Sequence, residues 1–383
     1  MMTRMRVVVA VVALWVGVSA QGTAPKGWDE VTAFFRDGVT QHGIQGASLA
    51  WIDNGRLAAL ETVGLADRDA GTPVTADTIY HWASITKTFT AVAIMQLRDQ
   101  GKLTLDDPAV DYVPELALAH NPHGSMRDIT IRHLLSHSAG FRGGTWPWGG
   151  NEPWHPFEPP GWEQVAAMMP YTQILFPPGS RYSYSNPGIV FLGRIIERIS
   201  GEPYETYIDK QILRPLGMRD AFFDRAPAHV RAHRSHSYYV RDTGAVDEAP
   251  FDFDSGITVS NGGLNAPVGD MAKWIAFLMG APANDAVLAR ASLEEMFTPI
   301  VPVVNDGLGE QNVGEGGMGL SFFVETHQGV RLVAHSGGQN GFISHFFIHP
   351  ASKTAYIVAF NTDGTTRALD AALRDEIVTR LWR

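Results

Sequence analysis

The chain is organised around Ser84-Ile85-Thr86-Lys87, which stands at the head of the apolar run 88–97. We expect a helix to begin near Ser84, so that Ser84 and Lys87, three residues apart, lie on one face. A serine at this position can cap the helix and hold its hydroxyl at the positive end of the helix dipole. A lysine one turn later can reach that oxygen, and a desolvated amine can activate it as a nucleophile. The alternative is a capping serine followed by a solvated lysine, because S-x-x-K is frequent by chance.

A second polar stretch, Tyr184-Ser185-Asn186, holds the only Y-x-N of the chain and precedes a helix that we expect from Ile189. A tyrosine beside a lysine can serve as a general base. An asparagine offers a donor and an acceptor to a substrate ester or amide. The alternative is a polar turn with a helix-capping asparagine.

The third stretch is His335-Ser336-Gly337-Gly338, which we expect at the end of a strand. Glycines in a strand let a ligand or another backbone approach closely. A substrate can then lie along the strand, with a main-chain N–H pointing at its carbonyl oxygen. The alternative is a glycine-rich hairpin loop.

These three motifs, in this order, resemble the signatures S-x-x-K, Y-x-N and K/H-[ST]-G of the serine β-lactamase-like superfamily. That superfamily includes class C β-lactamases, D,D-peptidases and β-lactamase-like carboxylesterases. The resemblance extends from Trp28 to the C-terminus. Other stretches also resemble the family: Leu134-Leu135-Ser136-His137-Ser138-Ala139-Gly140, Pro187-Gly188 after Asn186, Pro215-Leu216-Gly217-Met218 and Gly262-Gly263-Leu264.

The resemblance implies a covalent mechanism without a metal or an organic cofactor. Ser84 attacks the substrate carbonyl after losing its proton to Lys87 or Tyr184. The backbone N–H groups of Ser84 and Gly338 form the oxyanion hole, and water hydrolyses the acyl-enzyme.

The resemblance also implies that Asn186, His335, Ser336 and Gly337 bind the substrate. Many β-lactamases carry lysine where this chain has His335. A histidine is mostly neutral near pH 7, which weakens the case for a substrate with a free carboxylate. Esters and peptide-like amides remain open.

The fold that we expect is an α/β + α arrangement of the β-lactamase/transpeptidase type. An antiparallel sheet flanked by helices makes up about 28–90 and 285–383, and a mostly helical domain of about 91–284 is inserted. Asn54-Gly55 predicts a hairpin between strands 47–52 and 57–63. Further strands are expected over 78–82, 318–325, 330–335, 343–349 and 354–361, and helices over 28–41, 85–100, 131–136, 189–199, 204–213 and 368–382.

The N-terminus has the pattern of a secretory signal peptide. Arg4 and Arg6 precede an apolar run of twelve residues, 7–18, and a small-residue site that ends at Ala20. We therefore expect residues 1–20 to be removed and the protein, 21–383, to be periplasmic or secreted. The alternative is a membrane anchor, for which the run is too short.

The charge of the chain limits the classes of molecule that we expect it to bind. The chain has 30 basic and 40 acidic residues and no cysteine. Without Arg4 and Arg6 the charge is 28 − 40, or −12, which argues against nucleic acid and anionic membranes as partners. We expect a small-molecule or peptide substrate and no stable membrane insertion.

Two other clusters carry weaker signals. His229, His233 and His236 could share one helix face and bind a metal, but the interleaved arginines favour a solvated polar segment. The tryptophan-rich stretch 141–162 is either a surface loop packed on itself or an aromatic wall over the site.

These observations predict an exported serine hydrolase that acts through an acyl-enzyme on esters or peptide-like amides. A β-lactamase or a D-alanyl-D-alanine carboxypeptidase is the alternative within enzymes. A non-catalytic sensor of cell-wall peptides or penicillins is the alternative of another class.

Overall fold

The computed structural model describes residues 22–143, 161–241, 243–281, 286–303 and 315–383. The expected signal peptide, and Trp146, Trp148 and Trp154 of the tryptophan-rich stretch, lie outside these ranges. Within them, no helix combines the length and the apolar character that a membrane crossing requires.

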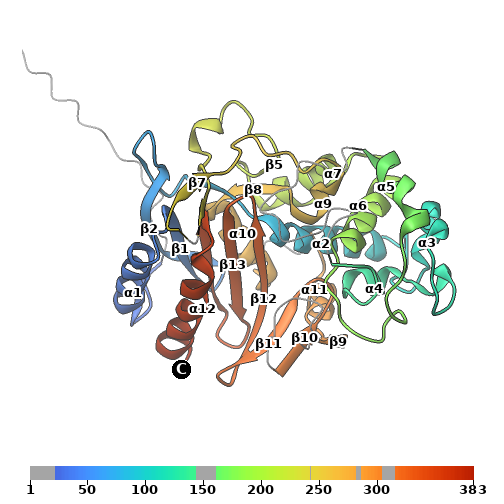
Figure 1. The fold of residues 1–383 in the computed structure, drawn as a ribbon. Coiled ribbons are helices and arrows are strands. Elements are labelled where there is room, and N and C mark those ends of the chain that lie inside the picture. The colour runs from blue at the N-terminus through green and yellow to red at the C-terminus, as the bar shows by residue number, and fades with distance from the viewer. Residues whose placement is uncertain (1–21, 144–160, 242, 282–285, 304–314) are drawn as a thin grey trace, which may run out of the picture.

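A nine-stranded sheet forms the centre of the molecule (Figure 1). All the pairings between its strands are antiparallel. This confirms the expected antiparallel sheet, and it joins the two ends of the chain, because β1 pairs with β14. The strand order is β3 (Thr72–Pro73), β2 (Arg56–Asp67), β1 (Gly46–Asp53), β14 (Thr354–Phe360), β13 (Phe342–His349), β12 (Val330–Gln339), β11 (Phe323–His327), β10 (Glu315–Met318) and β9 (Val301–Pro302).

Asparagine-glycine turns make two of the hairpins of this sheet. The expected turn at Asn54-Gly55 is confirmed, with φ of 47° and 76°. Asn340-Gly341 makes the same kind of turn between β12 and β13, with φ of 48° and 76°. The expected strand 330–335 is therefore too short, since β12 continues through the two glycines that follow Ser336 and pairs with β13 as far as Gln339.

The expectation of one continuous strand over 318–325 is wrong, because a turn separates β10, which ends at Met318, from β11, which begins at Phe323. The N–H of Gly319 bonds to the carbonyl of Phe322, and Ser321 has a φ of 63°. The N–H of Ser321 donates to the carbonyl of Leu135, 2.8 Å away, so the turn is held by the helical part of the chain.

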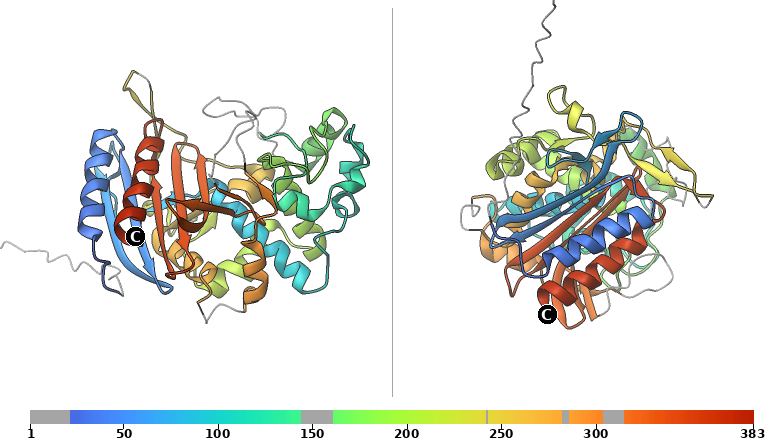
Figure 2. Two further views of the ribbon diagram at one scale, coloured as in Figure 1. Left: turned by 90° about the horizontal axis from the view of Figure 1, so that it is seen from below. Right: turned by 90° about the vertical axis from the view of Figure 1, so that its left-hand side faces the viewer.

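Both faces of the sheet are buried. Helices α1 (Trp28–Gln41) and α12 (Thr366–Ile377) lie side by side across one face (Figure 2). Residues of β1 alternate between the faces: Leu49 and Trp51 pack with the cluster of α1 and α12, and Ala50 and Ile52 pack with the other. The helix expected over 368–382 is confirmed in two parts, because α12 passes into a π-helical turn over Val378–Trp382.

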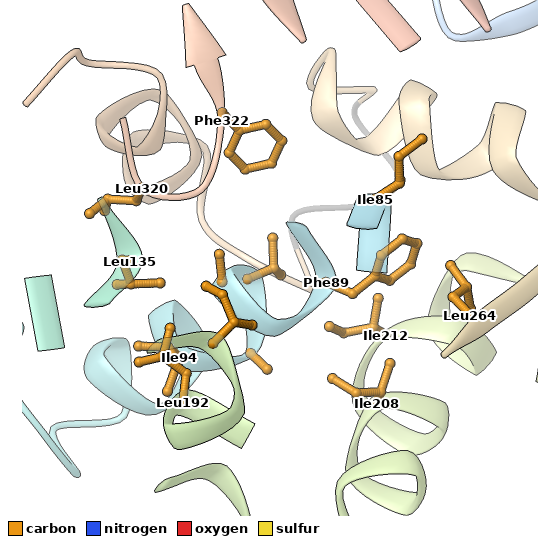
Figure 3. Packing of buried hydrophobic residues seen from close by; sticks show 14 of the residues in the cluster. Ile85, Phe89, Ile94, Leu135, Leu192, Ile208, Ile212, Leu264, Leu320 and Phe322 are labelled. Carbon is orange, nitrogen blue, oxygen red and sulfur yellow. The ribbon is translucent and has the colours of Figure 1, made fainter. Parts of the chain in front are cut away.

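The other face is covered by helices, and Figure 3 shows the apolar residues that pack around α2. From Thr86 to Leu97 every residue of α2 is buried, as expected of a helix packed on all sides. The helices on this side are α2 (Thr86–Asp99), α3 (Ala109–Tyr112), α4 (Ile131–Leu135), α5 (Trp162–Met168), α6 (Asn186–Ser200), α7 (Tyr204–Ile208), α8 (Arg214–Leu216), α9 (Val259–Gly262), α10 (Val268–Leu278) and α11 (Arg290–Met296).

Two small sheets complete the fold. One has the order β4 (Ile79–His81), β8 (Leu264–Pro267), β5 (Phe222–Phe223), and the other the order β15 (Thr362–Asp363), β6 (Tyr238–Val240), β7 (Val246–Glu248). The first of these sheets positions the turn that carries Ser84, because β4 runs directly into it. The division at residues 90 and 285 stays a prediction.

Candidate active site

Ser84 lies in a 3₁₀ turn, Ala83–Ile85, that connects β4 to α2. The expectation that Ser84 caps the helix is wrong, because α2 begins at Thr86 and no side-chain hydrogen bond caps it. Ala83 has a φ of 46°, a left-handed conformation that costs free energy in a residue with a side chain. The indole of Trp82 compensates by donating to the carbonyl of Ala266, 2.8 Å away. The turn is thus anchored, and it leaves Ser84 partly exposed.

Lys87 is fully buried, and its ammonium contacts Ser84. Lys87 Nζ donates to Ser84 Oγ over 2.8 Å and to the main-chain oxygen of Asn261 over 2.8 Å. It also lies 4.9 Å from the centre of the Tyr184 ring. The alternative of a solvated lysine therefore does not hold. The structure brings together the candidate nucleophile and both candidate bases that the sequence indicates.

Tyr184 is buried in the loop that precedes α6, and His137 supports it from the loop that follows α4. The two rings are stacked, with centres 4.4 Å apart. His137 Nδ1 accepts the N–H of Ser185, and the carbonyl of His137 accepts the N–H of Ser183. Burial, followed by the nearby Lys87 cation, lowers the pKa of His137 well below its usual value, so this ring is neutral at pH 7.

Asn186 is the first residue of α6, and Ser185 is its N-cap. The alternative that Asn186 caps the helix is wrong, because Ser185 Oγ accepts the N–H of Gly188. The buried Oδ1 of Asn186 has no hydrogen-bond partner among the described residues. A buried carbonyl oxygen without a donor is uncommon in folded proteins.

Gly337 of β12 passes directly against the turn that carries Ser84. A Cβ atom on Gly337 would lie 2.2 Å from the carbonyl oxygen of Trp82, so only glycine fits there. Gly338, the next residue, is exposed, and a Cβ there would find no atom closer than 3.2 Å. Close approach of β12 to the turn brings Gly338 and Ser84 to the wall of one cavity.

That cavity has a volume of about 280 Å³. β12 pairs with β11 only as far as Ala334, whereas its pairing with β13 continues to Gln339. The cavity is lined by Ser84, Tyr184, Phe323, Ser336, Gly337, Gly338, Ile343, His345, Arg367 and Asp370. A neighbouring cavity of about 210 Å³ shares five of these residues and also touches His335. Of the expected site residues, six line these two cavities: Ser84, Tyr184, His335, Ser336, Gly337 and Gly338. Lys87 and Asn186 line neither, although Lys87 contacts Ser84 directly.

His335 is buried beside Lys87 and is neutral. Burial, then the Lys87 cation, lower the pKa of His335 to about 3. Its Nδ1 is 2.7 Å from the carbonyl oxygen of Ser336, which makes Nδ1 the protonated nitrogen of the neutral ring. At pH 7 this position therefore carries no cation.

The sequence does not predict five residues of the cavity wall: the apolar Phe323 and Ile343 and the polar His345, Arg367 and Asp370. His345 of β13 lies opposite Ser336, its Nδ1 bonds to Asp370 Oδ2 of α12, and Arg367 of the same helix lies nearby. The turn at Asn340-Gly341 could have placed His345 opposite Ser336, because the register of a two-residue hairpin follows from its turn. No local pattern could have placed Arg367 and Asp370, which depend on how α12 packs on the sheet.

The weaker sequence signals have different outcomes. Trp162, the last residue of the tryptophan-rich stretch, packs edge-on to Phe191 and donates to Glu115, so it lies among the helices. In the described part of the chain, no three or more His, Asp and Glu side chains are grouped to hold a metal ion. His229, His233 and His236 do not share a helix, since only a short 3₁₀ turn, Arg231–His233, forms there.

Comparisons with known proteins agree with this arrangement. The chain is 26% identical to Protein flp of Staphylococcus aureus (strain MW2) over 330 residues, which is 85% of this chain and 62% of that protein. It is 30% identical to Esterase EstB of Burkholderia gladioli over 198 residues, half of each chain. The chain thus spans less than two thirds of these two relatives.

Among solved structures, the octameric penicillin-binding protein homologue from Pyrococcus abyssi is similar, with a TM-score of 0.76 and 29% identity. The similarity covers 90% of this chain and 77% of that one, and it confirms the β-lactamase/transpeptidase-like fold. The family model described as Beta-lactamase matches residues 31–379. The chain belongs to the Beta-lactamase family.

Proposed function

We propose that this protein is a serine hydrolase that forms an acyl-enzyme on Ser84, with esters of small uncharged acyl groups as its substrates. The observation that carries the proposal is the 2.8 Å contact between buried Lys87 Nζ and Ser84 Oγ, at the wall of a cavity that Gly338 also lines. A nucleophile bonded to a candidate base and facing a small cavity is the arrangement that acyl transfer requires.

The reaction proceeds in two steps. Ser84 Oγ forms a bond to the carbonyl carbon while its proton passes to Lys87 in its neutral amine form or to a Tyr184 phenolate beside the Lys87 cation. The N–H groups of Ser84 and Gly338 stabilise the oxyanion. The intermediate collapses with loss of the alcohol, which takes the proton, and leaves an ester on Ser84. Water then attacks that ester by the same route in reverse and releases the acid.

The charges around the cavity favour an uncharged ester. His335 is neutral, so it supplies no cation for a substrate carboxylate. Asp370, which lines the cavity, adds a carboxylate that repels one. The relative from Burkholderia gladioli is named as an esterase, which supports this class of substrate.

One observation favours the second candidate, a β-lactamase or a D-alanyl-D-alanine carboxypeptidase. Arg367 lines the same cavity, and its guanidinium is 3.9 Å from Asp363 with 70% of its side chain exposed. An arginine in that position can bind a carboxylate through two parallel hydrogen bonds. Both acidic neighbours, Asp363 and Asp370, reduce that attraction, which is why we rank this candidate second.

A comparison of two chromogenic substrates separates the candidates. We expect kcat/KM for p-nitrophenyl butyrate to exceed that for nitrocefin at pH 8, and Arg367→Gln to leave this order unchanged. If nitrocefin is hydrolysed faster, and Arg367→Gln abolishes that advantage, the carboxylate-bearing class is correct and our proposal is wrong.

The Ser84→Ala variant tests the covalent step and the non-catalytic alternative. We expect it to keep the fold, to lose labelling by a fluorophosphonate probe and to lose turnover by about 10⁴-fold or more. A sensor would show no turnover in the wild type. Near wild-type hydrolysis by Ser84→Ala would refute the mechanism.

We further propose that the protein is exported, because Arg4, Arg6 and the apolar run before Ala20 form a signal-peptide pattern. Mass spectrometry of the protein made in a secreting bacterial host should find a chain that begins after Ala20 or a few residues later. An intact N-terminus at Met1 in that host would contradict export with cleavage.

A further inference from the structure

His81 is a buried histidine that stands three residues before Ser84 and has no part in the reaction described above. It is the last residue of β4 and is only 1% exposed. Its ring lies 5.7 Å from the ring centre of Phe253 and 6.1 Å from that of Phe342, a packing that an apolar side chain would also provide. Burying the two ring nitrogens costs free energy unless both are hydrogen-bonded. The partners of these nitrogens therefore indicate what the histidine does.

Asn265 determines which nitrogen of the His81 ring carries the proton. The two residues lie opposite each other in the pairing of β4 with β8, and Asn265 Oδ1 is 3.3 Å from His81 Nδ1. The other end of the amide is not available to the ring, because Nδ2 donates to the carbonyls of Gly263, 3.1 Å away, and Asp224, 3.3 Å away. His81 Nδ1 therefore carries a proton and donates it to Asn265 Oδ1.

The His81 ring is neutral, so its second nitrogen, Nε2, is an acceptor. Burial, followed by the cation of buried Arg234, lowers the pKa of His81 to about 4, and no carboxylate of the described residues pairs with the ring. The terminal amide of Gln339 lies next to Nε2, with Oε1 3.1 Å away. A neutral ring cannot donate to that oxygen. Half a turn of the amide, which exchanges two groups of nearly equal shape, lets its NH₂ group donate to Nε2.

The bond to His81 is the second of two contacts between the end of β12 and the segment 81–82. Side chains alternate along a strand, so positions 337 and 339 face the same side. Gly337 packs against the carbonyl oxygen of Trp82, from which an added Cβ would lie only 2.2 Å away, and Gln339 bonds to His81. Gly338, which has no side chain of its own to hold it, lies between these two contacts.

We propose that His81 is a positioning residue that keeps the N–H of Gly338 aligned with Ser84 Oγ. It acts as a neutral ring that donates to Asn265 and accepts from Gln339. The inference rests on the proposed function, because it uses the oxyanion role of Gly338 in that mechanism. An oxyanion donor stabilises the transition state only when it is correctly placed, and small displacements are costly.

The Gln339→Ala variant removes the link and leaves His81 in place. Gln339 and His81 do not line either cavity at the site, so loss of the link should affect the chemical step more than substrate binding. For p-nitrophenyl butyrate we expect kcat to fall about tenfold, with KM within about twofold of wild type. An unchanged kcat, or a rise in KM that accounts for the whole loss of kcat/KM, would overturn the proposal.

Asn340→Gly is the matched control for this variant. It removes the side-chain amide of the next residue, which donates to the carbonyl of Pro250 over 2.9 Å and makes no contact with His81. Glycine accepts the φ of 48° at this position, so the turn is kept. We expect kcat within about twofold of wild type, although one buried hydrogen bond is lost here too. Equal losses of kcat in the two variants would show that the effect comes from a weakened hairpin and not from His81.

His81→Phe tests the same link from the other side, since phenylalanine keeps the ring packing and removes both nitrogens. If the two residues act as one link, the double variant with Gln339→Ala should lose no more kcat than the worse single variant. Losses that add would contradict the proposal. Nitrogen NMR of the His81 ring decides the question if His81→Phe does not fold. We expect a proton on Nδ1 and no titration between pH 8 and about 5.5, whereas a proton on Nε2 or a ring that titrates in this range would overturn the proposal.

These measurements also separate failure of this proposal from failure of the hydrolase proposal. A wild-type protein that hydrolyses no ester would contradict the hydrolase. The protonated nitrogen of His81, and the coupling between His81→Phe and Gln339→Ala in the free energy of unfolding, would then still show whether the link exists.

Discussion

Gly337 and Gly338 are neighbours in β12, but only Gly337 packs against the turn that carries Ser84. Replacing each glycine by alanine tests whether that contact is what requires glycine. We expect Gly337→Ala to lower stability by about 1–3 kcal/mol, because the new Cβ would collide with the carbonyl oxygen of Trp82. The strand must move away from the turn, so kcat should fall about 100-fold, as small displacements of catalytic groups do. Urea denaturation and ester hydrolysis measure both effects.

Gly338→Ala is the control for this experiment. The atoms closest to its new Cβ are the ends of the flexible side chains of Ile343, at 3.2 Å, and Arg367, at 3.4 Å. We expect a change in stability below about 1 kcal/mol and activity within about fivefold of wild type. Equal losses in the two variants would show that contact with the Ser84 turn is not what requires glycine at position 337.

At the scale of residues, the sequence predicts which side chains meet at the site better than it predicts the backbone conformation that carries them. The spacing of Ser84 and Lys87 correctly predicts their contact, because residues three apart meet on a helical turn. It does not predict that Ser84 precedes the helix, because the left-handed Ala83 depends on the anchoring of Trp82 by β8, far along the chain. Arg234 was assigned to a solvated segment for a related reason: its burial comes from Phe251 and Phe342.

At the scale of elements, the loop after α4 contacts the loop before α6 and fixes its position. His137 joins the two, by stacking on Tyr184 and by accepting the N–H of Ser185. His137→Leu removes the acceptor and loosens Tyr184, which is one of the two candidate bases. We expect kcat to fall about tenfold or more, with KM little changed, because the chemistry depends on the position of Tyr184 while the cavity wall remains.

His133→Leu is the matched control, four residues earlier in the same segment. His133 Nδ1 also accepts a main-chain N–H, from Thr130, but this contact caps α4 and does not touch Tyr184. We expect a small loss of stability and unchanged kcat. If the two variants lose the same stability and the same activity, His137 has only a structural role.

Sequence patterns predict elements well where the signal is local. The turn at Asn54-Gly55 and the helix 28–41 are confirmed, because turn residues and apolar spacing determine them. The strand 318–325 fails because Ser321 is held by the carbonyl of Leu135, nearly two hundred residues away. The sequence does not predict that Arg367 and Asp370 lie at the cavity for the same reason, because their position depends on how α12 packs on the sheet.

At the scale of the whole molecule, three histidines among the described residues are fully buried and neutral, and they predict how stability depends on acid. Burial, with Arg234 next, lowers the pKa of His81 to about 4; that of His335 is lowered to about 3, and that of His137 is also well below its usual value. In the unfolded chain each titrates near 6.5. Below that pH the unfolded state therefore binds protons that the folded state does not, and stability falls as pH falls.

Buried carboxyl groups work in the opposite direction: burial raises the pKa of Glu325, and it raises that of Asp224 to about 7. Between pH 7 and about 4 the folded state therefore holds a proton on Asp224 that the unfolded state releases. For the three histidines and Asp224 the balance is three protons minus one, or two, in favour of the unfolded state. At ~1.4 kcal/mol per proton and pH unit, the free energy of unfolding should fall by about 3 kcal/mol per unit between pH 6 and 5.

Urea denaturation between pH 5 and 8 measures this slope, and His335→Gln is the variant that isolates one proton. Glutamine keeps a hydrogen-bond donor for the carbonyl of Ser336 but has no charge to gain, so the slope below pH 6 should fall by about one third to one half. The substitution can also lower stability at every pH. Comparing how steeply the free energy of unfolding changes with pH in the two proteins removes that constant loss. Two results would contradict this prediction: a stability that is constant from pH 8 to 5, or a slope that His335→Gln leaves unchanged. Either result would mean that His335 can take up a proton in the folded protein. The argument that this position carries no cation for a substrate carboxylate would then also be wrong.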